Sequence, residues 1–250
     1  MSLRDLANIL PKDHLIKVAA SKPDLVDWNE ISRLEGKLSE EFIERNANRV
    51  NWKFISRYQK LSEPFIHKFR DRVDWEKILE YQNVSKEFIK KHAEFINWDK
   101  ISEQPGLSEE FIEYYKDYLN WHVISEKQEL SEEFIERHAD RVDWKAISRH
   151  QKLSEDFIER HADDVNWYNI SIFQKLSESF IEKFSDRVNW QGIAIFQELS
   201  YEFIEKFKDK LDFELLLDYQ KLSKELIKKY KNRFKSESSR FKVKNILNHR

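Results

Sequence analysis

The sequence predicts an all-α protein, an α-solenoid in which short helix-turn-helix repeats of 23 residues stack on one another. The segment LSEEFIERHADRVDWKAISRHQK fills residues 130–152 of the 250-residue chain, and close variants of it occupy both sides. Self-similarity at so strict a period is the signature of a repeat architecture. With only 3 Gly and 4 Pro, the chain lacks the turn residues of a hairpin-rich β fold. Its 8 Trp, 9 Tyr and 18 Phe indicate a folded core, although 36% of the residues are charged.

Two columns of residues fix the repeat boundaries. One column recurs at the 23-residue step and consists of Leu38, Leu61, Leu107, Leu130, Leu153, Leu176, Leu199 and Leu222, with Val84 in the one gap. The other consists of Trp52, Trp75, Trp98, Trp121, Trp144, Trp167 and Trp190, followed by Phe213, and Trp28 precedes it by 24 residues. These columns predict an N-terminal cap with a degenerate first repeat (1–37), eight full repeats (38–221), and a half repeat with a basic C-terminal cap or tail (222–250).

The two ends of the chain carry apolar residues that we expect to cover the terminal repeats, as solenoids require. At the N-terminus these are Leu3, Leu6, Ile9 and Leu10. At the C-terminus, residues 235–240 (KSESSR) are predicted to form a linker. The segment after it carries the predicted cap residues Phe241, Val243, Ile246 and Leu247.

The first helix of each repeat is expected to begin after a Ser and to run for eight to ten residues. In the 130–152 repeat, Ser131 supplies a capping hydroxyl, and Glu132 and Glu133 favour the positive end of the helix dipole. Phe134 and Ile135 form the apolar face of this helix. Because such helices are too short to persist alone, stacking on neighbouring repeats must stabilise them.

The second helix is expected to begin after Asp143, which is Asp or Asn in every repeat. Trp144, Ile147, Ser148 and Gln151 then follow at i, i+3, i+4 and i+7, on one helical face. The large Trp side chains are the predicted apolar anchors of the stack. Buried Ser and Gln side chains need hydrogen-bond partners, so we expect these two columns to bond the backbone of the next repeat.

The variable positions of the second helices are the candidate partner-binding site. The two positions after each Trp and the two before each Gln are predicted to point away from the core. Their character changes along the stack from charged to apolar, and an exposed apolar patch of this size is typical of a partner site. The alternative is that these residues pack against the C-terminal segment or at a tighter bend of the superhelix. The candidate residues are Lys145, Arg149, Tyr168, Ile172, Phe173, Ile195 and Phe196.

A basic stripe on the first helices is the candidate anion- or nucleic-acid-binding site. Repeated cations along a solenoid favour a phosphate backbone, and the residues concerned are Arg137, Arg141, Arg160, Lys183, Arg187, Lys206 and Lys210. In the alternative interpretation, the stripe is a solvated surface whose cations pair with acidic residues four positions earlier, such as Glu133 and Asp156. Residues 221–250 add a net charge of +9, whereas the remainder carries −11 within the total of −2.

No catalytic residue, metal site or cofactor is predicted. The absence of Cys excludes disulfides and thiol nucleophiles, and no phosphate-binding Gly loop is present. His92, His138 and His161 share a repeat position with Phe69, Tyr115, Phe184 and Phe207, which is typical of a packing position. The initial MSLRDLANIL lacks the apolar core of a secretory signal, and no stretch is apolar enough to cross a membrane.

The pattern L-S-E-E-F-I … V-[DN]-W-x-x-I-S-x-x-Q-K resembles uncharacterised short α-helical repeats in proteins of large DNA viruses, phages and some bacteria. The resemblance covers roughly residues 38–234 and implies a binding role inside a cell, in the host cytoplasm if the protein is viral. We therefore expect a cytoplasmic, monomeric protein that binds a protein partner as a scaffold, adaptor or inhibitor. Binding of nucleic acid through the basic stripe and tail, and a structural or assembly role, are the alternatives.

Overall fold

The computed structural model describes residues 11–248, and over this range it contains helices and no strand. The predicted all-α solenoid is confirmed. The chain divides into two compact units, Met1–Ile101 and Ser102–Arg250, which are described one after the other. The predicted N-terminal cap residues Leu3, Leu6, Ile9 and Leu10 lie outside the described residues.

The first unit contains short helices that follow one another as hairpins. Its helices are α2 (Lys12–Ser21), η1 (Pro23–Leu25), α3 (Trp28–Ser32), α4 (Glu40–Arg45), α5 (Trp52–Tyr58), α6 (Glu63–Lys68), α7 (Trp75–Tyr81), α8 (Lys86–Lys91), η2 (Ala93–Phe95) and α9 (Trp98–Ser102), which crosses the boundary by one residue.

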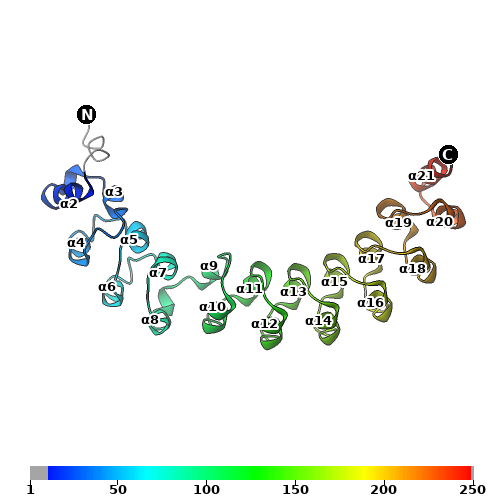
Figure 1. The fold of residues 1–250 in the computed structure, drawn as a ribbon, viewed down its shortest axis with the longest axis horizontal. Coiled ribbons are helices and arrows are strands. Elements are labelled where there is room, and N and C mark those ends of the chain that lie inside the picture. Colours follow the sequence, from blue (N-terminus) through cyan, green and yellow to red (C-terminus); the bar gives the residue numbers. More distant parts are fainter. Residues whose placement is uncertain (1–10, 249–250) are drawn as a thin grey trace. The chain divides into compact units, whose positions relative to one another are not determined.

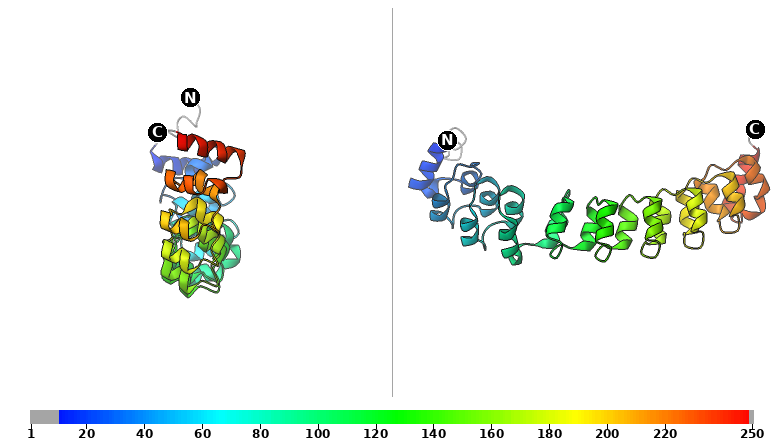
Figure 2. Two further views of the ribbon diagram at one scale, coloured as in Figure 1. Left: turned by 90° about the vertical axis from the view of Figure 1, so that its right-hand side faces the viewer. Right: turned by 60° about the horizontal axis from the view of Figure 1, so that its bottom comes forward.

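The second unit continues the same alternation. Its helices are α10 (Glu109–Tyr114), α11 (Trp121–Lys127), α12 (Glu132–Arg137), α13 (Trp144–His150), α14 (Glu155–Arg160), α15 (Trp167–Phe173), α16 (Glu178–Lys183), α17 (Trp190–Phe196), α18 (Tyr201–Lys206), α19 (Phe213–Tyr219), α20 (Lys224–Lys229), η3 (Lys231–Arg233) and α21 (Glu237–Asn248). Within each unit, the second helices of the hairpins form one row and the first helices form another (Figures 1 and 2).

The helix starts agree with the predicted caps, but the helices are shorter than expected. Ser131 accepts a hydrogen bond from the Phe134 N–H, and Asp143 accepts from the N–H groups of Lys145 and Ala146. The two helices of this repeat hold 6 and 7 residues instead of eight to ten. The first ends early because residues 138–142 form a turn, and the second ends where Gln151 adopts an extended backbone (ψ 153°).

The branched aliphatic residue of each second helix is more deeply buried than the Trp. Ile124, Ile147 and Ile170 are fully buried, whereas Trp144 and Trp167 are only partly so. Each Trp ring instead lies between its own repeat and the next first helix. Trp144 stacks on Phe157 at a centroid distance of 6.2 Å, and its Nε1 donates to the Ala139 carbonyl. The Trp column therefore joins repeats at the edge of a core that the branched aliphatic residues fill.

The Gln and Ser columns form a hydrogen-bonded ladder, as predicted, although the Gln bonds run the other way. The amide of Gln151 donates to the carbonyls of Ser125 and Gln128 in the preceding repeat and accepts from the Leu130 N–H. Only the Ser column reaches forward: Ser148 Oγ accepts from the N–H of Asn166 in the following repeat. Each Gln is the first residue after the second helix of its repeat. Its side chain therefore lies beside the end of the second helix of the preceding repeat.

The first-helix acids add a second link between repeats that the capping interpretation did not include. The carboxylate of Glu132 accepts hydrogen bonds from the backbone N–H and hydroxyl of Ser154, 22 residues later. Glu155 binds Ser177 and Glu178 binds Ser200 in the same way. Each of these Glu residues thus fixes the Ser that caps the next first helix.

The ladder is interrupted between α7 and α9, by one residue of the first unit and one at the start of the second. Leu79 stands where α5, α9, α11, α13 and α15 carry Ser, and Pro105 stands where the other full repeats carry Gln. Neither side chain can form the bonds of the ladder. The helix α9 is also only 5 residues long, and Gly106 follows it with a positive φ of 76°. This interruption lies close to the boundary between the two units.

The C-terminal segment caps the last repeats, but not in the way that the sequence suggested. The helix α21 begins at Glu237, and Ser239 is buried, so residues 235–240 are not simply a linker. Val243, Ile246 and Leu247 pack on the core formed by α17, α19 and α20. Phe241 was expected to join them, but it points outward and is 67% exposed, because it lies on the opposite face of α21.

Candidate partner-binding surface

Three exposed aromatic rings stand on successive second helices of the second unit. Phe173, Phe196 and Tyr219 each directly precede the ladder Gln and are 46%, 57% and 59% exposed. We call these three residues the aromatic column. Phe173 and Phe196 were predicted, whereas Tyr219 was missed, although its place at the same 23-residue step was visible in the sequence.

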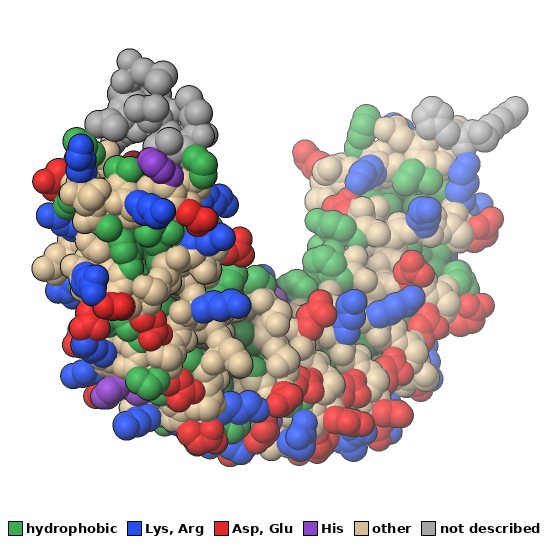
Figure 3. All heavy atoms as spheres, turned by 60° about the vertical axis from the view of Figure 1, so that its left-hand side comes forward, with side chains coloured by type: hydrophobic (Ala, Val, Ile, Leu, Met, Phe, Trp, Pro, Cys, Tyr) green, Lys and Arg blue, Asp and Glu red, His purple; other side chains and the backbone are tan. Residues whose placement is uncertain are grey.

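The other predicted apolar residues lie beside the aromatic column. Tyr168 is 59% exposed, whereas Ile172 and Ile195 are half-buried. Ile172 contacts the next helix closely, since a Cβ atom added to Gly192 would lie 2.9 Å from its Cγ1 atom. Figure 3 shows hydrophobic side chains gathered on the surface of the C-terminal repeats.

In α13, α15 and α17, the second position after the Trp does not belong to this surface, contrary to the prediction. Ala146, Asn169 and Gly192 are buried at that position. The side-chain amide of Asn169 donates to the Lys145 carbonyl of the preceding helix. This position therefore faces the preceding second helix, a relation between hairpins that the helical periodicity alone does not reveal.

A groove separates Phe196 from Tyr219, two neighbouring rings of the aromatic column. Between α17 and α19 it has a volume of about 380 Å³ and is lined by residues 195–199 and 219–221, among them Phe196, Leu199 and Tyr219. An equivalent groove of about 440 Å³ lies between Tyr58 and Tyr81 in the first unit. Both grooves lie between aromatic residues that directly precede Gln in consecutive repeats.

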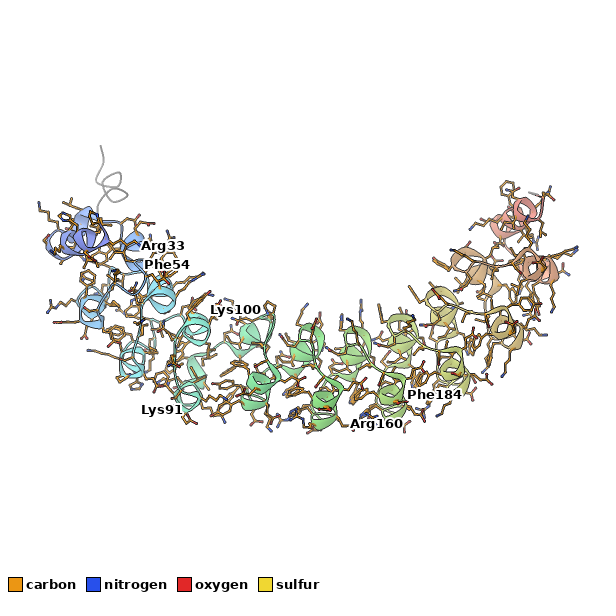
Figure 4. All side chains as sticks on the ribbon, viewed as in Figure 1. Arg33, Phe54, Lys91, Lys100, Arg160 and Phe184 are labelled. Atoms are coloured by element: carbon orange, nitrogen blue, oxygen red, sulfur yellow. The ribbon has the colours of Figure 1, made fainter. Side chains whose placement is uncertain are left out.

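Basic side chains border the aromatic column at its N-terminal end. The Arg149 guanidinium lies 4.9 Å from the centroid of the Phe173 ring, and Lys145, Lys152 and Lys175 are exposed nearby in the sequence. The Arg57 guanidinium bears the same relation to Tyr81, at 4.8 Å. Figure 4 shows a related contact in which Arg33 approaches Phe54, at 4.1 Å.

The acidic side chains at the other end of the column are already engaged. Asp218 forms an ion pair of 2.6 Å with Lys242. Glu214 accepts hydrogen bonds from the backbone N–H groups of Lys235 and Ser236 and from the hydroxyls of Ser236 and Ser239. These bonds, led by the Ser236 hydroxyl, lower the pKa of Glu214 to about 2. The C-terminal segment thus occupies these carboxylates and leaves the aromatic rings exposed.

The basic stripe pairs with acids of the preceding repeat rather than of its own helix. Six of its seven predicted residues form ion pairs across repeats, 24 residues apart in the sequence: Arg141–Asp117, Arg160–Glu136, Lys183–Glu159, Arg187–Asp163, Lys206–Glu182 and Lys210–Asp186. Arg137 instead lies 5.4 Å from the centroid of the Phe134 ring. The predicted i,i+4 pairing does form between Arg45 and Glu41. Figure 3 shows the resulting mixture of acidic and basic side chains.

Part of the basic stripe also has a structural role at the backbone. The Ala162 carbonyl accepts hydrogen bonds both from Trp167 Nε1, at 2.8 Å, and from the Arg187 guanidinium of the next repeat, at 2.5 Å. Lys210 donates to the Ser185 carbonyl in the same manner. These cations therefore stabilise the end of the preceding turn, and an anion would have to compete with that role.

The His residues occupy a packing position, as predicted: His138 is buried, and its ring centroid lies 4.9 Å from that of Trp121 and 4.6 Å from that of Phe134. The same position also places His138 and His161 beside a carboxylate of the preceding repeat, which the sequence did not reveal. His138 Nε2 lies 2.6 Å from Glu113, and His161 Nε2 lies 3.0 Å from Glu136. The hydrogen bond with His161 lowers the pKa of Glu136. In the first unit, His67 Nδ1 lies 2.8 Å from His92 Nε2. Among residues 11–248, no three His, Asp or Glu side chains come together as a potential metal site.

The described helices include none with the length and apolar character needed to cross a membrane. Neither a known protein family, a curated protein sequence nor a solved structure matches this chain significantly. The fold alone defines its class, an α-solenoid of short helical hairpins.

Proposed function

We propose that this protein is a non-catalytic binding solenoid that recognises a protein partner through the aromatic column and its neighbours Tyr168, Ile172 and Ile195. The observation that carries the proposal is the exposure of three aromatic rings on successive helices of one rigid ladder. An exposed apolar patch of this kind is typical of an interaction site, and buried aromatic anchors dominate binding energies at interfaces.

The repeat framework supports the proposal because nearly every other recurrent side chain has an internal role. The Gln, Ser and first-helix Glu columns bind backbone groups of neighbouring repeats, as at Gln151 and Glu132. The basic stripe pairs with neighbouring carboxylates, as at Lys206 and Glu182. The aromatic column has no comparable task in the stack, which leaves contact with another molecule as its function.

Recognition of nucleic acid by the basic stripe is the weaker alternative. Exposed ion pairs are worth only about 0–1 kcal/mol each, so phosphates are able to displace the carboxylates. A phosphate backbone would nevertheless meet a row of acidic partners beside the cations, which opposes its binding. An assembly role through the ends of the solenoid has no specific observation in its favour.

Capture of partners from a lysate of the source cell tests the proposal, with nuclease-treated and untreated samples compared. We expect the wild-type chain to retain a specific protein in both samples and Phe173→Ser/Phe196→Ser/Tyr219→Ser to retain at least tenfold less of it. The exposed rings are better targets than Ile172, which packs on Gly192 and whose change would disturb the stack.

The matched control is Tyr58→Ser/Tyr81→Ser, which removes rings at the same repeat position in the first unit. This variant should retain the partner as the wild type does, and circular dichroism should show equal helicity for all three proteins. Equal capture by the triple variant, or capture that nuclease abolishes, contradicts the proposal.

A further inference from the structure

We infer that the aromatic column binds an acidic, aromatic-rich peptide segment of the partner, with the carboxylates of that segment at the Lys145–Lys175 end. This inference rests on the proposed function, because it concerns the same surface. It adds the chemistry and the direction of the segment that the surface recognises.

The groove between Phe196 and Tyr219 is the apolar feature that favours such a segment. It is open to solvent, it is lined by Ile195 and Leu199 besides the two rings, and it can receive a bulky side chain. Aromatic residues bury roughly 150–250 Å² each. A segment with large apolar side chains therefore gains most at this end of the column.

The basic side chains beside the aromatic column are concentrated at its N-terminal end. Lys145, Arg149, Lys152 and Lys175 are exposed, and within the described residues none of them forms an ion pair with a carboxylate. Arg149 contacts only the face of the Phe173 ring among charged or aromatic groups. Carboxylates of a partner segment are the complementary groups for these cations, and such complementarity increases both specificity and the rate of association.

The distribution of these cations distinguishes a peptide from a single-stranded nucleic acid, which would also combine stacking with basic groups. A phosphate backbone needs a cation at every repeat. Beside the column, the repeats 176–198 and 199–221 carry the neutral or acidic residues Gln191, Glu198 and Asp218. Among the residues that line the groove, Lys221 is the one basic residue. The cations at one end and the apolar groove at the other match a segment that is acidic in one half and apolar in the other.

Selection from a phage-displayed library of random 12-residue peptides tests this inference on the full chain. Peptides that also bind Phe173→Ser/Phe196→Ser/Tyr219→Ser are removed by counter-selection, and the remaining ones are synthesised and measured by fluorescence anisotropy. We expect a net negative charge and at least two large apolar residues in each enriched peptide. Lys145→Glu/Arg149→Glu should weaken their binding at least tenfold, with a smaller loss at high salt.

Lys53→Glu/Arg57→Glu is the matched control, because these residues hold the same repeat positions in the first unit and should leave affinity unchanged. Enriched peptides that are neutral or basic, or that bind Lys145→Glu/Arg149→Glu normally, overturn the inference. Tighter binding of a 12-nucleotide oligouridine at the same residues overturns it in favour of nucleic acid. If capture of the lysate partner still requires the aromatic column, the proposed function stands without this inference. If neither capture of the partner nor peptide binding requires the column, both fail.

Discussion

A single Gln side chain holds three backbone groups, two in the preceding repeat and one at the start of its own. Gln151 satisfies the carbonyls of Ser125 and Gln128 and the N–H of Leu130, at 2.8–3.1 Å. These groups lie where one helix has ended and the next has not begun, so no helical partner is available to them. Only an amide offers both the donors and the acceptor that this site requires.

Gln151→Met should therefore destabilise the chain by roughly 2–4 kcal/mol, because buried backbone groups lose their partners while the side-chain volume is kept. Urea unfolding followed by circular dichroism measures this difference. The neighbouring Lys152→Met changes an exposed residue and should shift the free energy of unfolding by less than about 0.5 kcal/mol. If both variants change the free energy of unfolding by the same small amount, the ladder contributes little to stability.

At the scale of the element, α21 is held to the last full repeat by one carboxylate as well as by its apolar face. Glu214 lies on α19 and binds the residues that begin α21, while Val243 packs into the C-terminal core. The cap thus resembles the Glu–Ser contacts between ordinary repeats, although its own sequence departs from the repeat. Capping of this kind protects the apolar end of a solenoid from solvent.

Glu214→Gln should destabilise the C-terminal repeats at pH 7 by about 1–3 kcal/mol, since hydrogen bonds to a charged acceptor are lost. The pKa of Glu214 is lowered from 4.5 to about 2 in the folded chain. Its stabilising contribution is therefore present above pH 4.5 and disappears as the pH falls from 4.5 to 2.

Urea unfolding at pH 7, 4 and 3 should show the difference between wild type and Glu214→Gln shrinking with the pH. Glu237→Gln, an exposed acid in the first turn of α21, is the control and should change little at any of these pH values. A difference that stays constant with pH would exclude the charge of Glu214 as its source.

At the scale of the whole molecule, cooperativity depends on the links between adjacent repeats. At most junctions, the Ser hydroxyl accepts a hydrogen bond from the next repeat, the Gln amide donates to backbone carbonyls of the preceding repeat (the Gln clamp), and the second helices pack together. The junction between α13 and α15 is an example. The junction between α7 and α9 lacks the Ser and the Gln because Leu79 and Pro105 replace them. We therefore expect the repeats before and after this junction to unfold separately, in two transitions.

Restoring the ladder should merge the two transitions into one. The change replaces residues 103–106 (EQPG) by the Arg-His-Gln-Lys sequence of 149–152, together with Leu79→Ser. Calorimetry and hydrogen exchange at the Asn97 amide measure the result, with slower exchange expected in the variant. The control carries Ala in place of the introduced Gln; if it behaves like the full replacement, the Gln clamp does not govern cooperativity.

The sequence alone was sufficient to predict the local features of the fold. The 23-residue period gave the number and order of hairpins, and Ser131 and Asp143 marked the helix starts because a cap bonds an N–H only two or three residues away. Burial of the Ser and Gln columns followed from their place on the apolar face. The exposed rings Phe173 and Phe196 were also identified, since their spacing placed them away from the core.

The tertiary structure decided which residues meet across repeats. Three features depend on the offset between one hairpin and the next. They are the ion pairs of Lys183 and Lys206, the direction of the Gln clamp, and the burial of Asn169 and Gly192. That offset is a rigid-body relation, and helical periodicity within a single repeat carries no information about it. The same offset pairs the cations of the first helices with carboxylates, as at Lys183 and Lys206, and leaves Lys145 and Arg149 beside the aromatic column without an ion pair among the described residues.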